Sequence, residues 1–200
     1  MEGFIVTVYQ IKNEAYTYDV IDFHIVELSE TISKNNDLDT DTVLRMFMSS
    51  SLNNIEFSPL WPQGLNFAYF GKAKKQDYDI SRLGHFFIMK MPVYELLKER
   101  LANFGEFLPV KAEGNNMILF NLLTFGQEQK DMCLTKYEDG FEDGLELLTF
   151  EQDDIQNKLL FKSKLEGAQK VYCTDEFKNI IQSNNLKGLV FDEDLLDPFV

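Results

Sequence analysis

A strand–helix–strand pattern occurs twice in this chain, and it constrains the fold more than any other feature of the sequence. The first copy is MPVYELLKERLANFGEFLPV, residues 91–110, and the second is KVYCTDEFKNIIQSNNLKGLVFDE, residues 170–193. Each contains an apolar run, Val-Tyr at the entrance of a short amphipathic segment, and a glycine before a second apolar run. We interpret each copy as a helix lying across a sheet. A chance likeness stays open, because glycine follows short helices in many unrelated proteins.

The two amphipathic segments predict helices with different signals at their ends. In the first, over 92–105, Pro92 suits a first helical position and Gly105 ends the helix. Its apolar face comprises Val93, Leu96, Leu97, Leu101 and Phe104. In the second, Asp175 and Glu176 occupy the first turn, where negative charge is favoured, and Gly188 ends the unit's helix. Its buried stripe comprises Phe177, Ile180 and Ile181.

The remaining apolar runs read mainly as strands. Strands are predicted over 4–11, 84–91, 107–112, 116–125, 132–137, 158–165 and 189–191. A hairpin turn is predicted at Gly114, Asn115 and Asn116. Residues 16–28 fit a strand or a helix, 42–48 fit a short helix or a buried strand, and 57–79 read as irregular but packed chain.

These elements predict an α+β fold in which short helices pack on a mixed or antiparallel sheet. No linker-like stretch divides the chain, so we expect residues 1–200 to form a single compact unit. An N-terminal lobe over 1–80, beside a C-terminal part over 80–200, is the alternative.

Composition excludes several classes of protein. The chain has 200 residues, 44% of them hydrophobic, and 18 are Phe, which indicates a packed globule. Its net charge of −14 argues against direct binding of nucleic acid, which needs a basic surface. Two cysteines do not make a disulfide framework, and the sequence has no signal-peptide pattern or membrane-spanning apolar run. We therefore expect a cytoplasmic protein that does not bind membranes.

The order of the C-terminal segments resembles a family of bacterial immunity proteins from polymorphic-toxin systems, the myxobacterial type, formerly a domain of unknown function. The resemblance covers roughly residues 80–195. The likeness lies in Val93–Phe104, Glu106–Val110, Ile118–Leu123, Leu160–Lys162, Val171-Tyr172, Phe177-Lys178, Ile180-Ile181, Leu186, Gly188 and Phe191. The chain departs from the family at Cys173-Thr174, where a Ser-like helix cap is expected. The resemblance implies a small cytoplasmic protein that binds and neutralises a cognate toxin, and it carries over no catalytic residue.

The sequence offers weak signals for chemistry. His24 and His85 are far apart and lack metal-ligand spacing, so we interpret them as ordinary, partly buried histidines. Cys133 or Cys173 with His85 would be a nucleophile pair only if the fold brought them together. Asp37, Asp39 and Asp41 alternate as in a calcium loop, but the required Gly and Glu are missing, so a helix-capping loop is the better interpretation. We predict no catalytic residue, cofactor or metal.

The stretch YEDGFEDGLELLTFEQDD, residues 137–154, is the strongest signal outside the predicted core. It holds eight acidic side chains, no basic one, and interleaved aromatic and aliphatic residues. One interpretation is a solvated acidic loop with a helix or strand edge. The other is a surface for a basic partner, with aromatic anchors. On that interpretation the candidate partner-binding residues are Tyr137, Glu138, Asp139, Phe141, Glu142, Asp143 and Glu146.

The predicted function is therefore stoichiometric inhibition of a cognate, basic protein toxin, without catalysis. Two alternatives remain open. One is a binding module of another class, such as an acidic regulatory or assembly partner or a nucleic-acid mimic. The other is an enzyme that uses Cys133, His85 or the acidic stretch.

Overall fold

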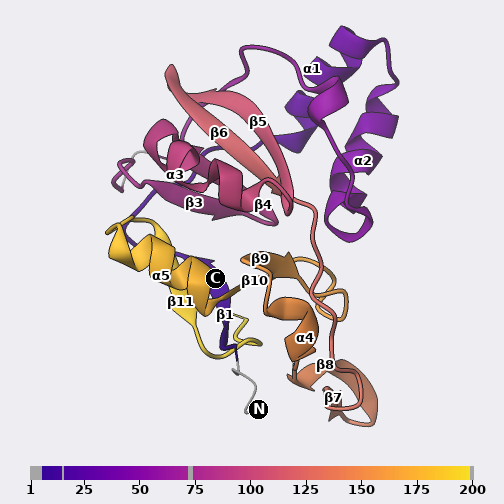
Figure 1. The fold of residues 1–200 in the computed structure, drawn as a ribbon. Helices are drawn as coiled ribbons and strands as arrows, with labels where there is room; N and C mark the ends of the chain where they lie inside the picture. Colours follow the sequence, from indigo (N-terminus) through magenta and orange to yellow (C-terminus); the bar gives the residue numbers. More distant parts are fainter. Residues whose placement is uncertain (1–5, 15, 72–73, 199–200) are drawn as a thin grey trace.

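Two β-sheets, a separate two-stranded ribbon and five α-helices build the computed structural model, which describes residues 6–14, 16–71 and 74–198 (Figure 1). Most strand pairs are antiparallel, and one pair is parallel. The predicted α+β class with short helices is confirmed.

The first sheet has five strands in the order β2-β5-β6-β4-β3. They are β2 (Asn66–Phe67), β3 (Ile80–Leu83), β4 (Phe86–Lys90), β5 (Gly105–Ala112) and β6 (Asn115–Leu122). Helix α3 (Met91–Leu101) connects β4 to β5, and these two strands flank β6 on either side. Only the β2–β5 pair is parallel.

The second sheet has four antiparallel strands in the order β11-β1-β10-β9. They are β1 (Val8–Asn13), β9 (Leu160–Lys162), β10 (Val171–Thr174) and β11 (Leu189–Asp192). Helix α5 (Asp175–Ser183) connects β10 to β11, and these strands flank β1.

Both predicted strand–helix–strand units are present, and they have the same strand arrangement. In each, the two strands joined by the helix lie on either side of a central strand that is antiparallel to both. A further strand, β3 or β9, pairs with the outer edge of the first strand of the unit. The central strand differs in origin, since β6 follows β5 through a tight turn whereas β1 comes from the start of the chain.

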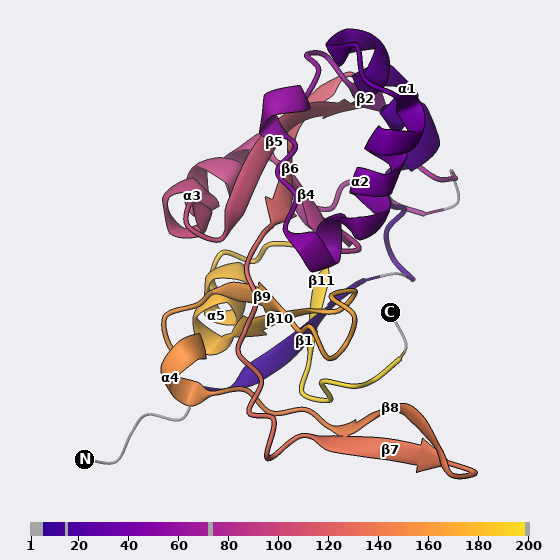
Figure 2. The ribbon, with the colours of Figure 1, turned by 90° about the vertical axis from the view of Figure 1, so that its right-hand side faces the viewer.

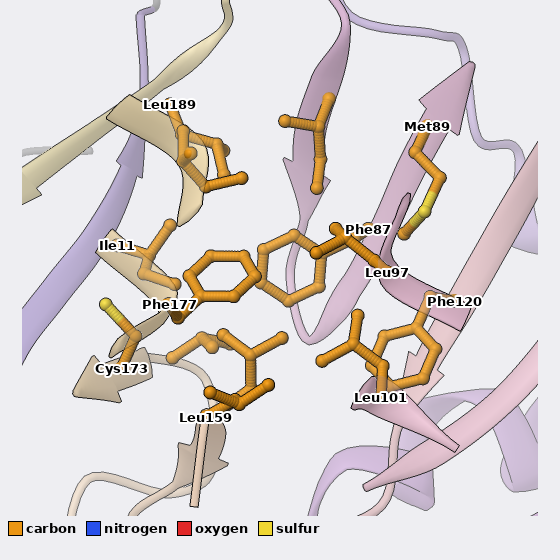
Figure 3. Close-up of a cluster of buried hydrophobic side chains, with 14 of the residues drawn as sticks. Ile11, Phe87, Met89, Leu97, Leu101, Phe120, Leu159, Cys173, Phe177 and Leu189 are labelled. Atoms are coloured by element: carbon orange, nitrogen blue, oxygen red, sulfur yellow. The ribbon is translucent and has the colours of Figure 1, made fainter. Parts of the chain in front are cut away.

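The two units share one hydrophobic core. Side chains from α3, α5 and both sheets belong to the same buried cluster. Figure 3 shows Phe87 of β4 next to Phe177 of α5, with Leu97, Leu101 and Phe120 on one side and Ile11, Cys173 and Leu189 on the other. The ring centroids of Phe87 and Phe177 are 6.5 Å apart.

The opposite face of the five-stranded sheet packs against N-terminal segments. Because side chains alternate along a strand, Phe87 and Met89 face α3 while Phe86 and Ile88 belong to a second core. Helices α1 (Ile25–Asn36) and α2 (Thr40–Asn53), the 3₁₀ turn η1 (Ser58–Leu60) and the following segment cover this face. Phe47 and Phe57 stack there with centroids 4.2 Å apart. Residues 57–71 and 74–79 are largely irregular, and several of their apolar side chains pack on this core, as predicted; residues 72 and 73 of the predicted segment lie outside the described part.

The described part of residues 1–80 is divided between the two sheets. β1 is the central strand of the four-stranded sheet, whereas α1, α2 and η1 pack on the five-stranded sheet. A third small cluster, with Phe150, Phe161 and Tyr172, lies near helix α4 (Gln152–Ile155). The ribbon of β7 (Leu134–Glu138) and β8 (Phe141–Leu147) extends from this end, opposite α1 and α2 (Figures 1 and 2).

Several predicted boundaries differ from the structure. The predicted strand 4–11 is observed as Val8–Asn13, with residues 4 and 5 outside the described part. The strand predicted over 84–91 is β4, preceded by a turn and by β3, which was not predicted. The strands predicted over 116–125 and 158–165 are shorter, as β6 and β9. The hairpin turn lies at Glu113-Gly114, whose φ angles are 45° and 85°, so Asn115 and Asn116 belong to β6.

The two glycines predicted to end helices do not end them; they lie where two backbones approach closely. Helix α3 ends at Leu101 and α5 at Ser183, before Gly105 and Gly188. A Cβ on Gly105 would lie 2.0 Å from the carbonyl oxygen of Asn121, and one on Gly188 would lie 2.2 Å from that of Ile80. Both glycines therefore allow close approach of two backbones. On α3, Leu96 is 37% exposed, so it does not belong to the buried face.

Candidate functional site

The seven candidate partner-binding residues all lie on the β7–β8 ribbon. The ribbon turns at Asp139-Gly140, where φ is 51° and 85°, the conformation that a tight two-residue hairpin turn requires. Every residue from Leu134 to Gly144 is exposed. The stretch had been predicted as a loop with a helix or strand edge, and the hairpin was missed although Asp-Gly between strand-like runs is a strong hairpin signal.

Near the tip, the side chains divide between two faces. Tyr137 is paired with Glu142, and Glu138 with Phe141, so the two pairs point to opposite sides of the ribbon. The Tyr137 hydroxyl lies 3.5 Å from Oε1 of Glu142, on one face. On the other face, Lys136 Nζ lies 2.5 Å from Asp143 and 3.7 Å from Glu138. Phe141 shares this second face through its pairing with Glu138.

Lys136 partly neutralises the acidic patch. It lies just before the stretch that the sequence marked as acidic, and its hydrogen bond and charge lower the pKa of Asp143. The same contact raises the pKa of Lys136. The ribbon from Leu134 to Leu147 still carries five acidic side chains against this one basic one. Its negative field therefore remains large at neutral pH.

Exposed apolar side chains accompany these charges. Phe141 is 77% exposed and Tyr137 is 62% exposed. Leu134 and Leu147 are also exposed, and they face each other at the base of the ribbon. An isolated two-stranded hairpin is at best marginally stable in water, because it has no hydrophobic face to bury. These exposed apolar side chains lie outside the three hydrophobic clusters of the described residues. The sequence pattern did not single out Leu134 or Lys136.

The base of the ribbon is fixed to the core. Cys133 and Thr149 are in contact across the base, and the main chain of Gln129 donates to the Thr149 carbonyl at 2.8 Å. Leu148 and Phe150, directly after β8, are buried. Hydrogen bonds and buried side chains therefore hold the base of the ribbon against the rest of the protein.

The last acidic residues of the stretch 137–154 are separate from the ribbon. Asp154 lies on α4, where its carboxylate accepts hydrogen bonds from Lys158 Nζ at 2.6 Å and from the main chain of Gln127 at 2.7 Å. This residue stabilises a turn. The candidate surface is therefore the ribbon, not the whole acidic stretch.

The histidines and cysteines considered for catalysis each contact different residues. His24 is an exposed residue at the start of α1, 3.2 Å from Asp22, whereas His85 is buried and its Nε2 lies 3.3 Å from the Ser50 hydroxyl. Both histidines had been predicted to be partly buried, and that prediction is wrong: His24 is exposed and His85 is buried. Cys173 is buried in the shared core, and Cys133 contacts Thr149 at the ribbon base. Within the described ranges no group of three or more His, Cys, Asp or Glu residues could hold a metal ion.

His85 lines the wall of a shallow cavity that sequence reasoning missed. The cavity has a volume of about 480 Å³, and its walls are mostly apolar, with Phe23, Phe47 and Phe86 among them. Burial, and the nearby charge of Lys162, lower the pKa of His85 to about 3. The imidazole is therefore neutral at pH 7, and it serves as a hydrogen-bonding group in an apolar wall.

A buried lysine joins the two halves of the fold. Lys162 of β9 has no exposed surface, and its Nζ donates to the Ser51 carbonyl at 2.6 Å and to Asn54 Oδ1 at 2.8 Å. These acceptors lie at the C-terminal end of α2, where a positive charge is favoured. Burial lowers the pKa of Lys162 to about 7. The contact positions α2 against the four-stranded sheet.

No protein-family model matches this chain, and a comparison with curated proteins finds no match. The resemblance to the immunity-protein family therefore rests on the residues quoted above and stays a prediction. Across the described ranges, none of the helices has the length and apolar character needed to cross a membrane.

Proposed function

We propose that this protein is a cytoplasmic immunity protein that binds a cognate bacterial toxin in a stoichiometric complex and neutralises it without catalysis. The exposed, acidic and aromatic β7–β8 ribbon is the observation that carries the proposal. The C-terminal sequence resemblance, which includes the two strand–helix–strand units, gives the class of partner. The toxin's contact surface is expected to be basic.

The chemistry of the ribbon fits a basic protein. A concentration of carboxylates accelerates association with a positively charged surface and repels phosphates, so it disfavours direct binding of nucleic acid. Affinity in protein complexes comes mainly from a few large side chains that become buried when the partner binds. Tyr137 and Phe141 are large aromatic side chains that are exposed in the free protein and available for such burial. Toxins that act on nucleic acids need basic clefts, and an acidic ribbon suits such a cleft.

An acidic regulatory or assembly module of another class would use the same ribbon. The two functions differ in their effect on the partner. An immunity protein abolishes a toxic activity at equal concentration, whereas an assembly module leaves its partner active within a complex.

The test is a pull-down with the tagged protein in its own host, washed at low and then at moderate salt. The expected result is one near-stoichiometric partner that is toxic when expressed alone and harmless when co-expressed with this protein. A non-toxic partner would favour the assembly module. Recovery of no partner at low salt would contradict both functions.

A charge-reversal pair tests the ribbon's part in that complex. Glu142→Lys with Asp143→Lys is expected to slow association and weaken its dependence on salt. The matched control is Glu27→Lys with Glu30→Lys, two exposed residues on α1 that give the same change in net charge. Equal association rates for the two double variants would show that net charge, not the ribbon, steers the encounter.

A further inference from the structure

The two exposed aromatic residues of the ribbon lie on opposite faces. Tyr137 shares one face with Glu142, and Phe141 shares the other with Lys136 and Asp143. Both rings are more than half exposed, at 62% and 77%. A partner that lay flat on the ribbon would cover one of these rings and leave the other in water.

We infer that the partner protein receives the tip of the β7–β8 ribbon in a basic cleft and contacts both of its faces. This inference rests on the proposed function, because it specifies how the same ribbon binds. It requires that Tyr137 and Phe141 each fill an apolar site on opposite walls of the cleft.

The charges support a cleft with basic walls. Glu142 lies on the Tyr137 face, and Glu138 and Asp143 lie on the Phe141 face, so carboxylates point in both directions. Asp139 occupies the turn at the tip. A partner with positive charge on one side only would leave the carboxylates of the other face without counter-charges. Two basic walls and a basic floor match all three directions.

The shape of the ribbon permits insertion. Its two strands pair with each other, and no third strand joins them among residues 6–14, 16–71 and 74–198. The tip is a two-residue turn, the narrowest connection that antiparallel strands use. Figure 2 shows the ribbon extending alone beyond the four-stranded sheet, so a partner can reach both faces.

A second copy of this chain fits the ribbon poorly. Two ribbons that paired along their edges would bring two sets of five carboxylates together, with one Lys136 in each set. Repulsion of like charges disfavours that contact. A separate, basic protein is therefore the occupant we assign.

Site-specific photocrosslinking in the host tests the inference. The probe is p-benzoylphenylalanine, introduced into the full chain at position 137, at position 141, or at position 16 as the control. Tyr16 is 99% exposed and lies outside the ribbon. Insertion predicts that positions 137 and 141 both crosslink to one and the same basic protein, at peptides that are distinct from each other, whereas position 16 does not.

Affinity measurements with the crosslinked protein, once purified, complete the test. Tyr137→Ala and Phe141→Ala are each expected to weaken binding by about tenfold or more, and Tyr16→Ala to leave it unchanged. If only one of positions 137 and 141 crosslinks and affects binding, the partner lies flat, and the inference is wrong while the proposed function stands. If neither position does, both the inference and the ribbon's function in binding are wrong.

Discussion

Phe87 of β4 and Phe177 of α5 contact each other edge to face, with ring centroids 6.5 Å apart, although they belong to different strand–helix–strand units. Both are completely buried, and the side chains around them come from both strand–helix–strand units. The two units therefore share a core, and removal of either ring is expected to weaken both sheets together.

Phe177→Ala tests this coupling. We expect a loss of about 3–5 kcal/mol in the free energy of unfolding, the usual cost of such a cavity. The chain has a single tryptophan, Trp61, which packs with the core on the far side of the five-stranded sheet. Its fluorescence and the far-UV circular dichroism should show the same, lowered midpoint in urea. An unchanged Trp61 transition beside a shifted dichroism transition would mean that the two sheets unfold independently.

Gly188→Ala should be among the most damaging small substitutions. The φ of Gly188 is 113°, and an added Cβ would lie 2.2 Å from the carbonyl oxygen of Ile80, so the backbones of β3 and the start of β11 would have to separate. We expect a loss of about 3 kcal/mol or more. Gly167→Ala is the matched control, because φ is 62° there and nothing lies within 4 Å of the added atom. It should cost about 1–2 kcal/mol. Equal losses in urea unfolding would exclude the steric explanation.

Lys162 should make stability depend on pH. Its pKa is about 7 in the folded protein and near its ordinary value of 10.5 in the unfolded chain, so the unfolded chain holds an extra proton between these values. The cost of burying the charge is complete below pH 7 and is relieved as pH rises above it. The contribution of Lys162 to the free energy of unfolding should therefore rise by about 1.4 kcal/mol per pH unit from pH 7 to pH 9.

Lys162→Met removes the titrating group and keeps most of the side chain's volume. The difference in unfolding free energy between the wild type and this variant should be nearly flat from pH 5 to 6, begin to rise near pH 7 and increase steadily from pH 7 to 9. Lys164→Met, at an exposed lysine two residues away, is the control for the loss of one positive charge. Parallel pH profiles for the wild type and Lys162→Met would show that Lys162 stays charged in the folded protein.

The sequence predicted the elements whose signals are local. The apolar faces and first turns of α3 and α5 are visible in the sequence, and both helices were found. Most of helix α1 was missed, since the segment 16–28, which was left open as strand or helix, covers only its first turn. The buried face of the helix includes Ser29 and Ser33. Their hydroxyls donate to the carbonyls of Ile25 and Ser29, one turn earlier, at 2.6 and 2.7 Å. Small polar residues satisfied in this way weaken the hydrophobic periodicity that reveals a helix.

Other features depend on contacts that the sequence does not display. Tyr9 pairs with Cys173 in the second sheet, across most of the chain, and no local pattern indicates that pairing. The candidate site was predicted in part, since its acidic and aromatic character is compositional. The division of Tyr137 and Phe141 between two faces follows from the Asp139-Gly140 turn and the strand register. Because the stretch was interpreted as a loop, without strand register, the sequence could not reveal that the two rings lie on opposite faces.

The most direct test of the proposed function is a titration of the captured partner's toxic activity with purified protein. The wild type should reduce that activity linearly to zero at one equivalent. A ribbon variant with Tyr137→Ala, Phe141→Ala and Glu142→Lys should need a large excess, while its thermal unfolding stays unchanged, because all three side chains are exposed. Full activity of the partner in a saturated wild-type complex would contradict neutralisation, and equal inhibition by the variant would contradict the ribbon as the binding surface.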